Sequence, residues 1–111
     1  MKIYLDDVRQ TPNGYIRCFN PAEVISYIEN DFDKIEEISL DHDLGIIEDG
    51  KERTGLDVLL YIEQMVYEGR IKKLPNIIIH SQNPAGVQRM KNALSSIKRR
   101  VEQQNEGQNY E

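Results

Sequence analysis

The stretch at residues 38–45, with the sequence ISLDHDLG, places the tightest limits on the fold. It is an apolar run, typical of a strand buried on both faces, that ends abruptly in two carboxylates and an imidazole. Two other short apolar runs end in the same way: residues 2–5 are followed by Asp6 and Asp7, and residues 77–79 by His80 and Ser81. Polar groups that gather beyond the carboxyl ends of strands are typical of open α/β sheets.

Helical patterns separate these runs. Asn20-Pro21 and Asn83-Pro84 each combine an N-cap residue with a proline at the first helical position, and residues 54–57 (TGLD) have the spacing of a capping box. Apolar residues recur at spacings of three and four after each start, and Gly69 suits the end of the second helix. Strands that alternate with helices in this way predict an α/β fold with a parallel sheet.

The segment at residues 15–19 is a further strand candidate whose pairing stays open. The turn at residues 11–14 (TPNG) fits an antiparallel hairpin, whereas a parallel pairing needs a crossover slightly longer than residues 6–14. With the helix from Pro21 on one face and the helices from Gly55 and Pro84 mainly on the other, the sheet has three layers, and the first and central strands are neighbours. We expect residues 46–53 to form a polar excursion with a turn at Asp49-Gly50.

Composition limits the remaining possibilities. In 111 residues there is room for one core, and we expect one domain over residues 1–102 followed by a polar C-terminal tail at 103–111. A net charge of −5 gives no support to bulk nucleic-acid binding, and no apolar run resembles a membrane span or a secretory leader. The single cysteine, Cys18, cannot form an internal disulfide, so a cytoplasmic protein is expected; the oligomeric state stays open.

Carboxylates at the strand ends predict a metal site. Asp6 and Asp7 follow the first strand, while Asp41 and Asp43 follow the central strand, so all four meet at one edge if these strands are neighbours. Crowded carboxylates repel one another unless a cation is present. Because oxygen ligands suit Mg²⁺ and Mn²⁺, we expect a divalent cation of this kind as the cofactor.

Groups near this predicted metal site suit a phosphate ligand. Arg9 is a natural phosphate clamp, and Ser81, Asn83 and the amides that open the last helix can orient phosphate oxygens. We expect His42 and His80 to transfer protons near neutral pH. Alternatively, one of the two histidines is a metal ligand. Each of these residues alone is more typical of a turn, a cap or a structural histidine, but their presence at three strand ends favours a functional site.

The motifs Leu5-Asp6-Asp7, Leu40-Asp41, Thr54-Gly55-Leu56-Asp57 and Ile79-His80-Ser81 together resemble the landmarks of response-regulator receiver domains. The resemblance implies a flavodoxin-like parallel sheet with strand order 2-1-3-4, in which residues 15–19 form a parallel second strand. It also implies that Asp6 and Asp7 help hold a cation, that Asp41 occupies the phosphoacceptor position, and that Ser81 contacts phosphate. The chain departs from that pattern because no first helix is evident before residue 15, and because the fifth strand, its lysine and the last helix are missing.

The segments at residues 6–9 (DDVR), 40–44 (LDHDL) and 80–83 (HSQN) together resemble more closely the shortened group of cyclic-phosphate processing receiver-like domains, up to about Val101. This resemblance implies a receiver site recast for hydrolysis. We therefore expect a metal-dependent phosphoesterase that acts on a cyclic phosphate, either of a nucleotide or of an RNA end, with Asp41, His42 and His80 as catalytic residues. Two alternatives stay open: a signalling module phosphorylated on Asp41, and a partner-binding module with a vestigial site.

Overall fold

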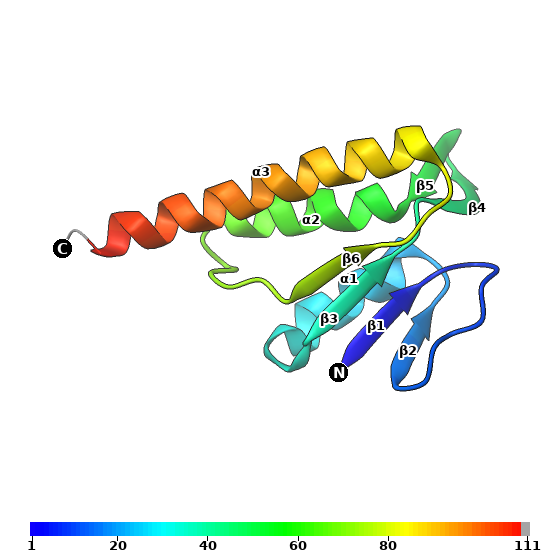
Figure 1. The fold of residues 1–111 in the computed structure, drawn as a ribbon, viewed down its shortest axis with the longest axis horizontal. Coiled ribbons are helices and arrows are strands. Elements are labelled where there is room, and N and C mark those ends of the chain that lie inside the picture. The colour runs from blue at the N-terminus through cyan, green and yellow to red at the C-terminus, as the bar shows by residue number, and fades with distance from the viewer. Residues whose placement is uncertain (110–111) are drawn as a thin grey trace.

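The computed structural model describes residues 1–109, and Figure 1 shows how their helices and strands are arranged. Over this part of the chain the elements are β1 (Lys2–Leu5), β2 (Tyr15–Cys18), α1 (Pro21–Asp31), a 3₁₀ turn (Phe32–Lys34), β3 (Glu37–Leu40), β4 (Asp43–Glu48), β5 (Lys51–Thr54), α2 (Gly55–Tyr67), β6 (Asn76–Ile79) and α3 (Pro84–Asn109).

Four strands form one parallel sheet in the order β2-β1-β3-β6 (Figure 1). The α/β class, the parallel sheet and the expected order 2-1-3-4 are therefore confirmed. β2 is parallel to β1, with Ile16 opposite Ile3, which answers the question that the local pattern left open. β1 lies beside β3, with Leu5 opposite Leu40, so the two acidic strand ends are neighbours as expected.

The three α-helices cover one face of the sheet. α2 packs against both α1 and α3, and the buried side chains of the sheet, among them Ile3, Ile38 and Ile77, form a single core with the helices. The alternate side chains point away from the helices: Lys2 and Ile78 are exposed, whereas Tyr4 and Ser39 are covered by the His80 side chain. Within residues 1–109 the fold therefore has two layers, whereas we expected three.

The handedness of the crossovers explains the single helical layer. The connections from β2 to β3 through α1 and from β3 to β6 through α2 run in the same direction across the sheet. Right-handed crossovers in the same direction place their helices on the same face. The connection that runs in the opposite direction, from β1 to β2, is a loop, so no helix is placed on the other face there.

Side-chain caps fix where the helices begin, as the sequence predicts. The Asn20 side chain accepts a hydrogen bond from the Glu23 amide at 2.9 Å, and Thr54 and Asp57 form the capping box of α2. α3 extends further than expected. Gln104 donates a hydrogen bond to the Val66 carbonyl at 2.8 Å, and the polar segment from residue 103 is helical as far as Asn109. Residues 110 and 111 of the expected tail lie outside the described part of the chain.

A β-hairpin replaces the polar excursion that we expected at residues 46–53. β4 pairs with β5 in antiparallel register, from Asp43 opposite Thr54 to Glu48 opposite Lys51. The turn falls at Asp49-Gly50 as expected, and its residues have φ angles of 53° and 74°. Positive φ at both positions is the requirement of a two-residue type I′ turn. The hairpin stands at the carboxyl edge of the sheet, because it begins directly after β3.

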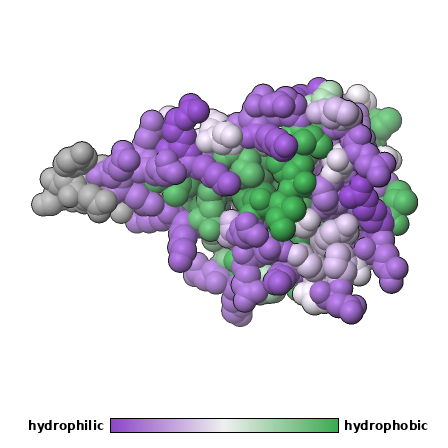
Figure 2. Space-filling view, viewed as in Figure 1, coloured by the Kyte–Doolittle hydropathy of each residue, from purple (hydrophilic) through white to green (hydrophobic). Residues whose placement is uncertain are grey.

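Figure 2 shows an apolar area over α3 and β6. β6 is an edge strand of the sheet, and its Ile78 is exposed, while Ala93 and Val101 of α3 are partly buried against the core. The area therefore belongs to a sheet edge and to one side of an amphipathic helix. Among residues 1–109, no helix has the length and hydropathy needed to cross a membrane.

Candidate metal and phosphate site

The carboxyl edge of the sheet brings the predicted strand ends side by side. The Asp6 amide donates to the Cys18 carbonyl at 3.2 Å, the Asp41 amide to Leu5 at 3.0 Å, and the His80 amide to Leu40 at 2.9 Å. These bonds continue the parallel ladder one residue past each strand. The side chains of residues 6, 41 and 80 are thereby held at neighbouring positions.

Three carboxylates form a cluster at this edge. Asp6, Asp7 and Asp41 each offer one carboxylate oxygen, and these atoms lie within 4.8 Å of one another. Asp6 is buried, Asp41 is half-buried and Asp7 is exposed, so the cluster opens to solvent on one side. Hard oxygen ligands at this separation fit a divalent cation such as Mg²⁺ or Mn²⁺. Asp43, the fourth predicted ligand, lies outside the cluster.

Hydrogen bonds hold the Asp6 carboxylate in one orientation. Its Oδ1 accepts from the amides of Val8 at 2.8 Å and Arg9 at 2.9 Å, which closes the turn after β1. Its Oδ2 accepts from His80 Nε2 at 3.0 Å. Burial acts to raise the pKa of Asp6, but these hydrogen bonds outweigh burial and leave the pKa below its usual value. Asp6 is therefore ionised and positioned at neutral pH.

Asp41 has the opposite electrostatic environment. Burial, followed by the negative charge of Asp6, raises the pKa of Asp41 above its usual value. Hydrogen bonds from the His42 amide and from the Ser81 side chain oppose this shift without cancelling it. A raised pKa is expected where carboxylates are crowded without a cation, and a bound cation reverses it. The negative charges of Asp6 and Asp41 are therefore not fully neutralised by their protein neighbours, as is typical of a site that binds a cation.

His80 is positioned by three neighbours on the open face of the sheet. Its Nε2 donates to Asp6, its Nδ1 lies 2.7 Å from Ser39 Oγ, and its ring stacks on Tyr4 at a centroid distance of 4.4 Å. Because a carboxylate only accepts hydrogen bonds, Nε2 carries the proton, and Nδ1 accepts from the Ser39 hydroxyl. Burial lowers the pKa of His80 despite the nearby Asp6 charge, so the ring is neutral at pH 7.

His42 is buried beneath the start of α3. Its Nδ1 donates to Asp43 Oδ1 at 2.7 Å, and a Cβ atom at Gly86 would lie 2.5 Å from its Cγ. Only glycine therefore fits where α3 crosses the ring. Neither His42 nor His80 lines the pocket described below, so their proton-transfer roles stay predictions.

A pocket of about 450 Å³ lies over the three carboxylates. Its walls come from the loop after β1, the β4–β5 hairpin and the turn before α3. The residues that line it are Asp6, Asp7, Val8, Arg9, Asp41, Asp43, Gly45, Ser81, Gln82 and Asn83. The structure therefore brings all the predicted metal and phosphate residues to one cavity. The sequence argument did not single out Val8, Gly45 or Gln82 as site residues.

The predicted phosphate-binding residues, Arg9, Ser81 and Asn83, all line this pocket. Arg9 is partly exposed at the rim, with its Nε 3.9 Å from Asp6 Oδ2. Ser81 Oγ accepts from the Asn83 amide at 3.2 Å. Asn83 also caps α3, since its Oδ1 accepts from the Gly86 amide at 3.1 Å, while its Nδ2 lies 3.2 and 3.3 Å from the two oxygens of Asp43. The His42 bond, followed by the Asn83 bond, lowers the pKa of Asp43.

Two glycines lie close to the residues of the candidate metal site. A Cβ atom at Gly55 would lie 2.0 Å from the Asp41 carbonyl oxygen, so only glycine lets α2 begin this close to the end of β3. Gly45 has φ +65°, and a Cβ atom there would lie 3.6 Å from Asp7 Oδ2. The sequence could have indicated a close contact at Gly55, because glycine, a poor helix former, occupies the first helical position after the capping Thr54.

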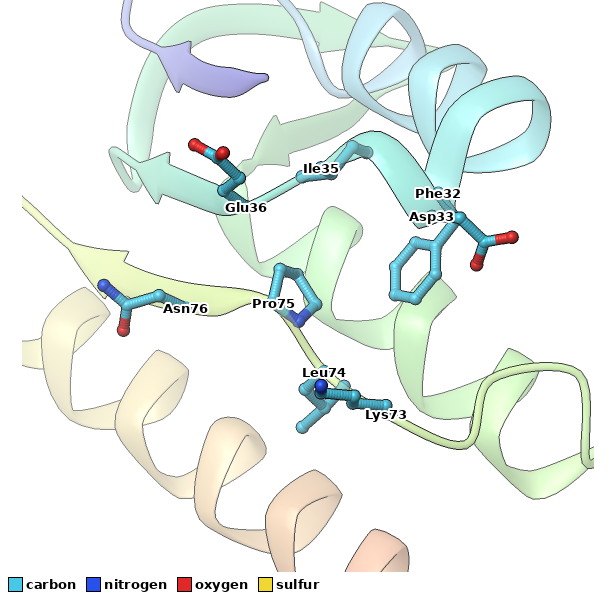
Figure 3. A pocket seen from close by; sticks show the side chains of 8 residues that line it. All are labelled: Phe32, Asp33, Ile35, Glu36, Lys73, Leu74, Pro75 and Asn76. Atoms are coloured by element: carbon cyan, nitrogen blue, oxygen red, sulfur yellow. The ribbon is translucent and has the colours of Figure 1, made fainter.

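A second cavity, of about 320 Å³, lies at the opposite end of the sheet, near the amino ends of β3 and β6 (Figure 3). Its lining includes Glu36, Lys73 and Asn76. None of the strand-end residues reaches it, so the chemistry predicted from the sequence belongs to the larger pocket.

The sheet order and the acidic cluster at its carboxyl edge define a receiver-like α/β domain. A comparison with protein families matches residues 1–96 to the cyclic-phosphate processing receiver domain, and the chain belongs to this family. The resemblance deduced from the strand-end motifs is thus confirmed. Comparisons with curated proteins and with solved structures gave no match.

Proposed function

We propose that this domain is a divalent-metal-dependent hydrolase of a cyclic phosphodiester carried by a nucleotide or an RNA end. The observation that supports this most directly is the cluster of Asp6, Asp7 and Asp41, whose oxygens lie within 4.8 Å of one another beneath an open pocket. Arg9 and Ser81 line the same pocket. Membership of a family named for cyclic-phosphate processing agrees with this chemistry.

Asp6, Asp7 and Asp41 are the residues that would hold Mg²⁺ or Mn²⁺, and Asp43, outside their cluster, lines the same pocket. When bound, such a cation polarises a phosphoryl oxygen and acidifies water. The hydrogen bonds to Asp6 orient its carboxylate before the cation arrives, so little ordering is needed on binding. Asp43 is held in the same way by His42 and Asn83.

Arg9 and Ser81 act on the substrate phosphate in this proposal. Arg9 reaches the pocket from the loop after β1, where its guanidinium can offset charge on the non-bridging oxygens as the ring opens. The Ser81 hydroxyl also lines the pocket, close to Asp41. Asp41 itself lines the pocket as one of the three carboxylates that would hold the cation beside the substrate phosphate. His42 and His80 support this arrangement through Asp43 and Asp6.

Phosphorylation of Asp41 is the second candidate function. Asp41 follows β3, which is the phosphoacceptor position of receiver domains, and its carboxylate lies beside Asp6 and Ser81. A domain of this kind would accept a phosphoryl group from a small donor. Incubation with acetyl phosphate and Mg²⁺ followed by intact mass measurement separates the two functions, since a stable adduct on Asp41 supports signalling.

Hydrolysis assays test the main proposal. Purified protein is incubated with 2′,3′- and 3′,5′-cyclic nucleotides in the presence of Mn²⁺ or of a chelator. We expect turnover of at least one cyclic substrate with Mn²⁺ and none with the chelator or in Asp41→Ala. Asp33→Asn, at an exposed carboxylate that lines the opposite cavity, is the matched control and should keep full activity. Absence of turnover across the panel would overturn the proposal.

A further inference from the structure

Two apolar side chains are exposed at the carboxyl edge beside the polar pocket. Val8 lines the pocket and is 82% exposed, and Phe19, which follows β2, is 53% exposed. Burial in the core explains neither side chain. Apolar and aromatic side chains that adjoin a polar pocket can contact the apolar part of a ligand.

Arg17 fixes the Phe19 ring next to the loop that carries Val8 and Arg9. The Arg17 guanidinium lies over the ring, with its Cζ 4.8 Å from the centroid. Its Nη1 also donates to the Arg9 carbonyl and to Thr11 Oγ1. One side chain thus joins the aromatic ring to the backbone of the predicted phosphate clamp.

The backbone also places Phe19 close to the carboxylates. The Cys18 carbonyl accepts the Asp6 amide at 3.2 Å, and Phe19 is the next residue. The ring therefore stands one residue from a strand end that is hydrogen-bonded to Asp6. In a nucleoside 2′,3′-cyclic phosphate, one ribose separates the base from the phosphate, so a base contact has to adjoin the phosphate site, and the bond between residues 6 and 18 places position 19 next to Asp6.

We propose that Phe19, together with the exposed Val8 of the pocket wall, is a stacking platform for the nucleobase of a nucleoside cyclic phosphate whose phosphate lies at Asp6, Asp7 and Asp41. This inference rests on the proposed function and names its substrate class. Bases stack on aromatic side chains with little regard to sequence. Because neither an apolar Val8 nor a phenyl ring reads the edge of a base, the platform favours a base over no base and discriminates little among bases.

Packing at the start of α1 is an alternative reason for an apolar side chain at position 19. Phe19 precedes the N-cap Asn20 of α1, the position at which a hydrophobic residue can pack against the fourth helical residue, here Val24. Val24 is completely buried, whereas about half of Phe19 is exposed. Such packing needs an apolar side chain of similar size, so Phe19→Leu preserves it and removes the aromatic face.

Equilibrium binding tests the platform. Adenosine 2′,3′-cyclic phosphate is compared with glycerol 1,2-cyclic phosphate, which has the same ring ester without the base and ribose, by rapid-mixing titration with Mn²⁺ present, so that binding is read before hydrolysis proceeds. We expect the wild type to prefer the adenosine compound by about tenfold. Phe19→Leu should reduce that preference to less than threefold while the affinity for the glycerol compound changes by less than twofold. Phe19→Tyr should keep the preference.

A proton NMR measurement with Mg²⁺ gives an independent signature, since stacking shifts the adenine H2 and H8 resonances upfield in the wild type but not in Phe19→Leu. An equal preference in wild type and Phe19→Leu, no preference in the wild type, or no binding of either compound would overturn the inference. Turnover of both compounds without a base preference would leave the proposed hydrolysis standing and remove the platform. A base preference without turnover would support the platform and overturn the proposed hydrolysis.

Discussion

His80 Nε2 donates to Asp6 Oδ2 across 3.0 Å, although the two residues are 74 positions apart in the chain. The bond joins the ends of β1 and β6, which are separated in the sheet by β3. Ser39, from β3, bonds the other ring nitrogen of His80 at 2.7 Å. One imidazole therefore links three strands to the most buried carboxylate of the candidate metal site.

His80→Ala should weaken Mn²⁺ binding by about 10- to 100-fold, the usual cost of losing a partner that orients a metal ligand. His80→Gln, whose side-chain amide can donate to Asp6, should recover part of this loss. Calorimetric titration with Mn²⁺ measures both affinities, and circular dichroism checks that the fold is kept. Unchanged Mn²⁺ affinity in the folded His80→Ala protein would show that Asp6 needs no such support.

Divalent metal should stabilise the folded protein. At a concentration one hundred times the dissociation constant, Mn²⁺ adds about 2.7 kcal/mol to the free energy of unfolding, because it binds the folded state alone. Thermal melts with Mn²⁺ and with a chelator measure the shift. Asp41→Asn should lose most of it and Asp33→Asn none. A shift of equal size in wild type and Asp41→Asn would place the metal elsewhere.

Asp41→Asn should also stabilise the metal-free protein at pH 7. The pKa of Asp41 is raised in the folded state, by burial and then by the charge of Asp6. An acid of raised pKa binds its proton more tightly when folded, so its ionisation destabilises the fold as pH rises above the unfolded pKa. Denaturant titrations of both proteins should show an advantage for Asp41→Asn at pH 7 that shrinks as the pH falls toward the ordinary pKa of 3.8. An advantage that does not depend on pH would refute this assignment.

Gly55→Ala should disturb the site through the backbone. The added methyl would meet the Asp41 carbonyl oxygen at 2.0 Å, so α2 or the end of β3 has to move, at a cost of about 1–3 kcal/mol in unfolding free energy. Gly69→Ala is the matched control, since its φ of +76° imposes strain of about 1 kcal/mol but nothing lies within 4 Å. Metal affinity should fall in the first variant and not in the second.

Cys18 should make the fold less stable in alkali. Burial, with a smaller contribution from the Glu23 charge, raises the pKa of its thiol from 9.0 to about 12. The folded state keeps the proton that the unfolded state loses, so stability falls as pH rises from 9 toward 12. Between pH 8 and 10 the loss is about 1.4 kcal/mol in unfolding free energy. Denaturant titrations should show this loss in wild type, beyond any that remains in Cys18→Val.

Several features of the fold follow from local chemistry and could be read without coordinates. Asn20, Thr54 and Asn83 cap helices because their side chains satisfy amides only a few residues away. The apolar runs that end in Asp6, Asp41 and His80 are parallel strands whose carboxyl ends share an edge. Asp49 and Gly50 were predicted as a turn, but the strands on either side were not, because their sequences carry little apolar alternation.

The sequence by itself thus determined the class of fold, the helix starts and the gathering of Asp6, Asp7 and Asp41, since each depends on local chemistry or on the ordering of strands. Tertiary structure decided which polar groups became partners. His42 and His80 look equivalent in the sequence, yet one lies under Gly86 and the other stacks on Tyr4, because side-chain contacts between distant segments exist only once the sheet and helices have packed.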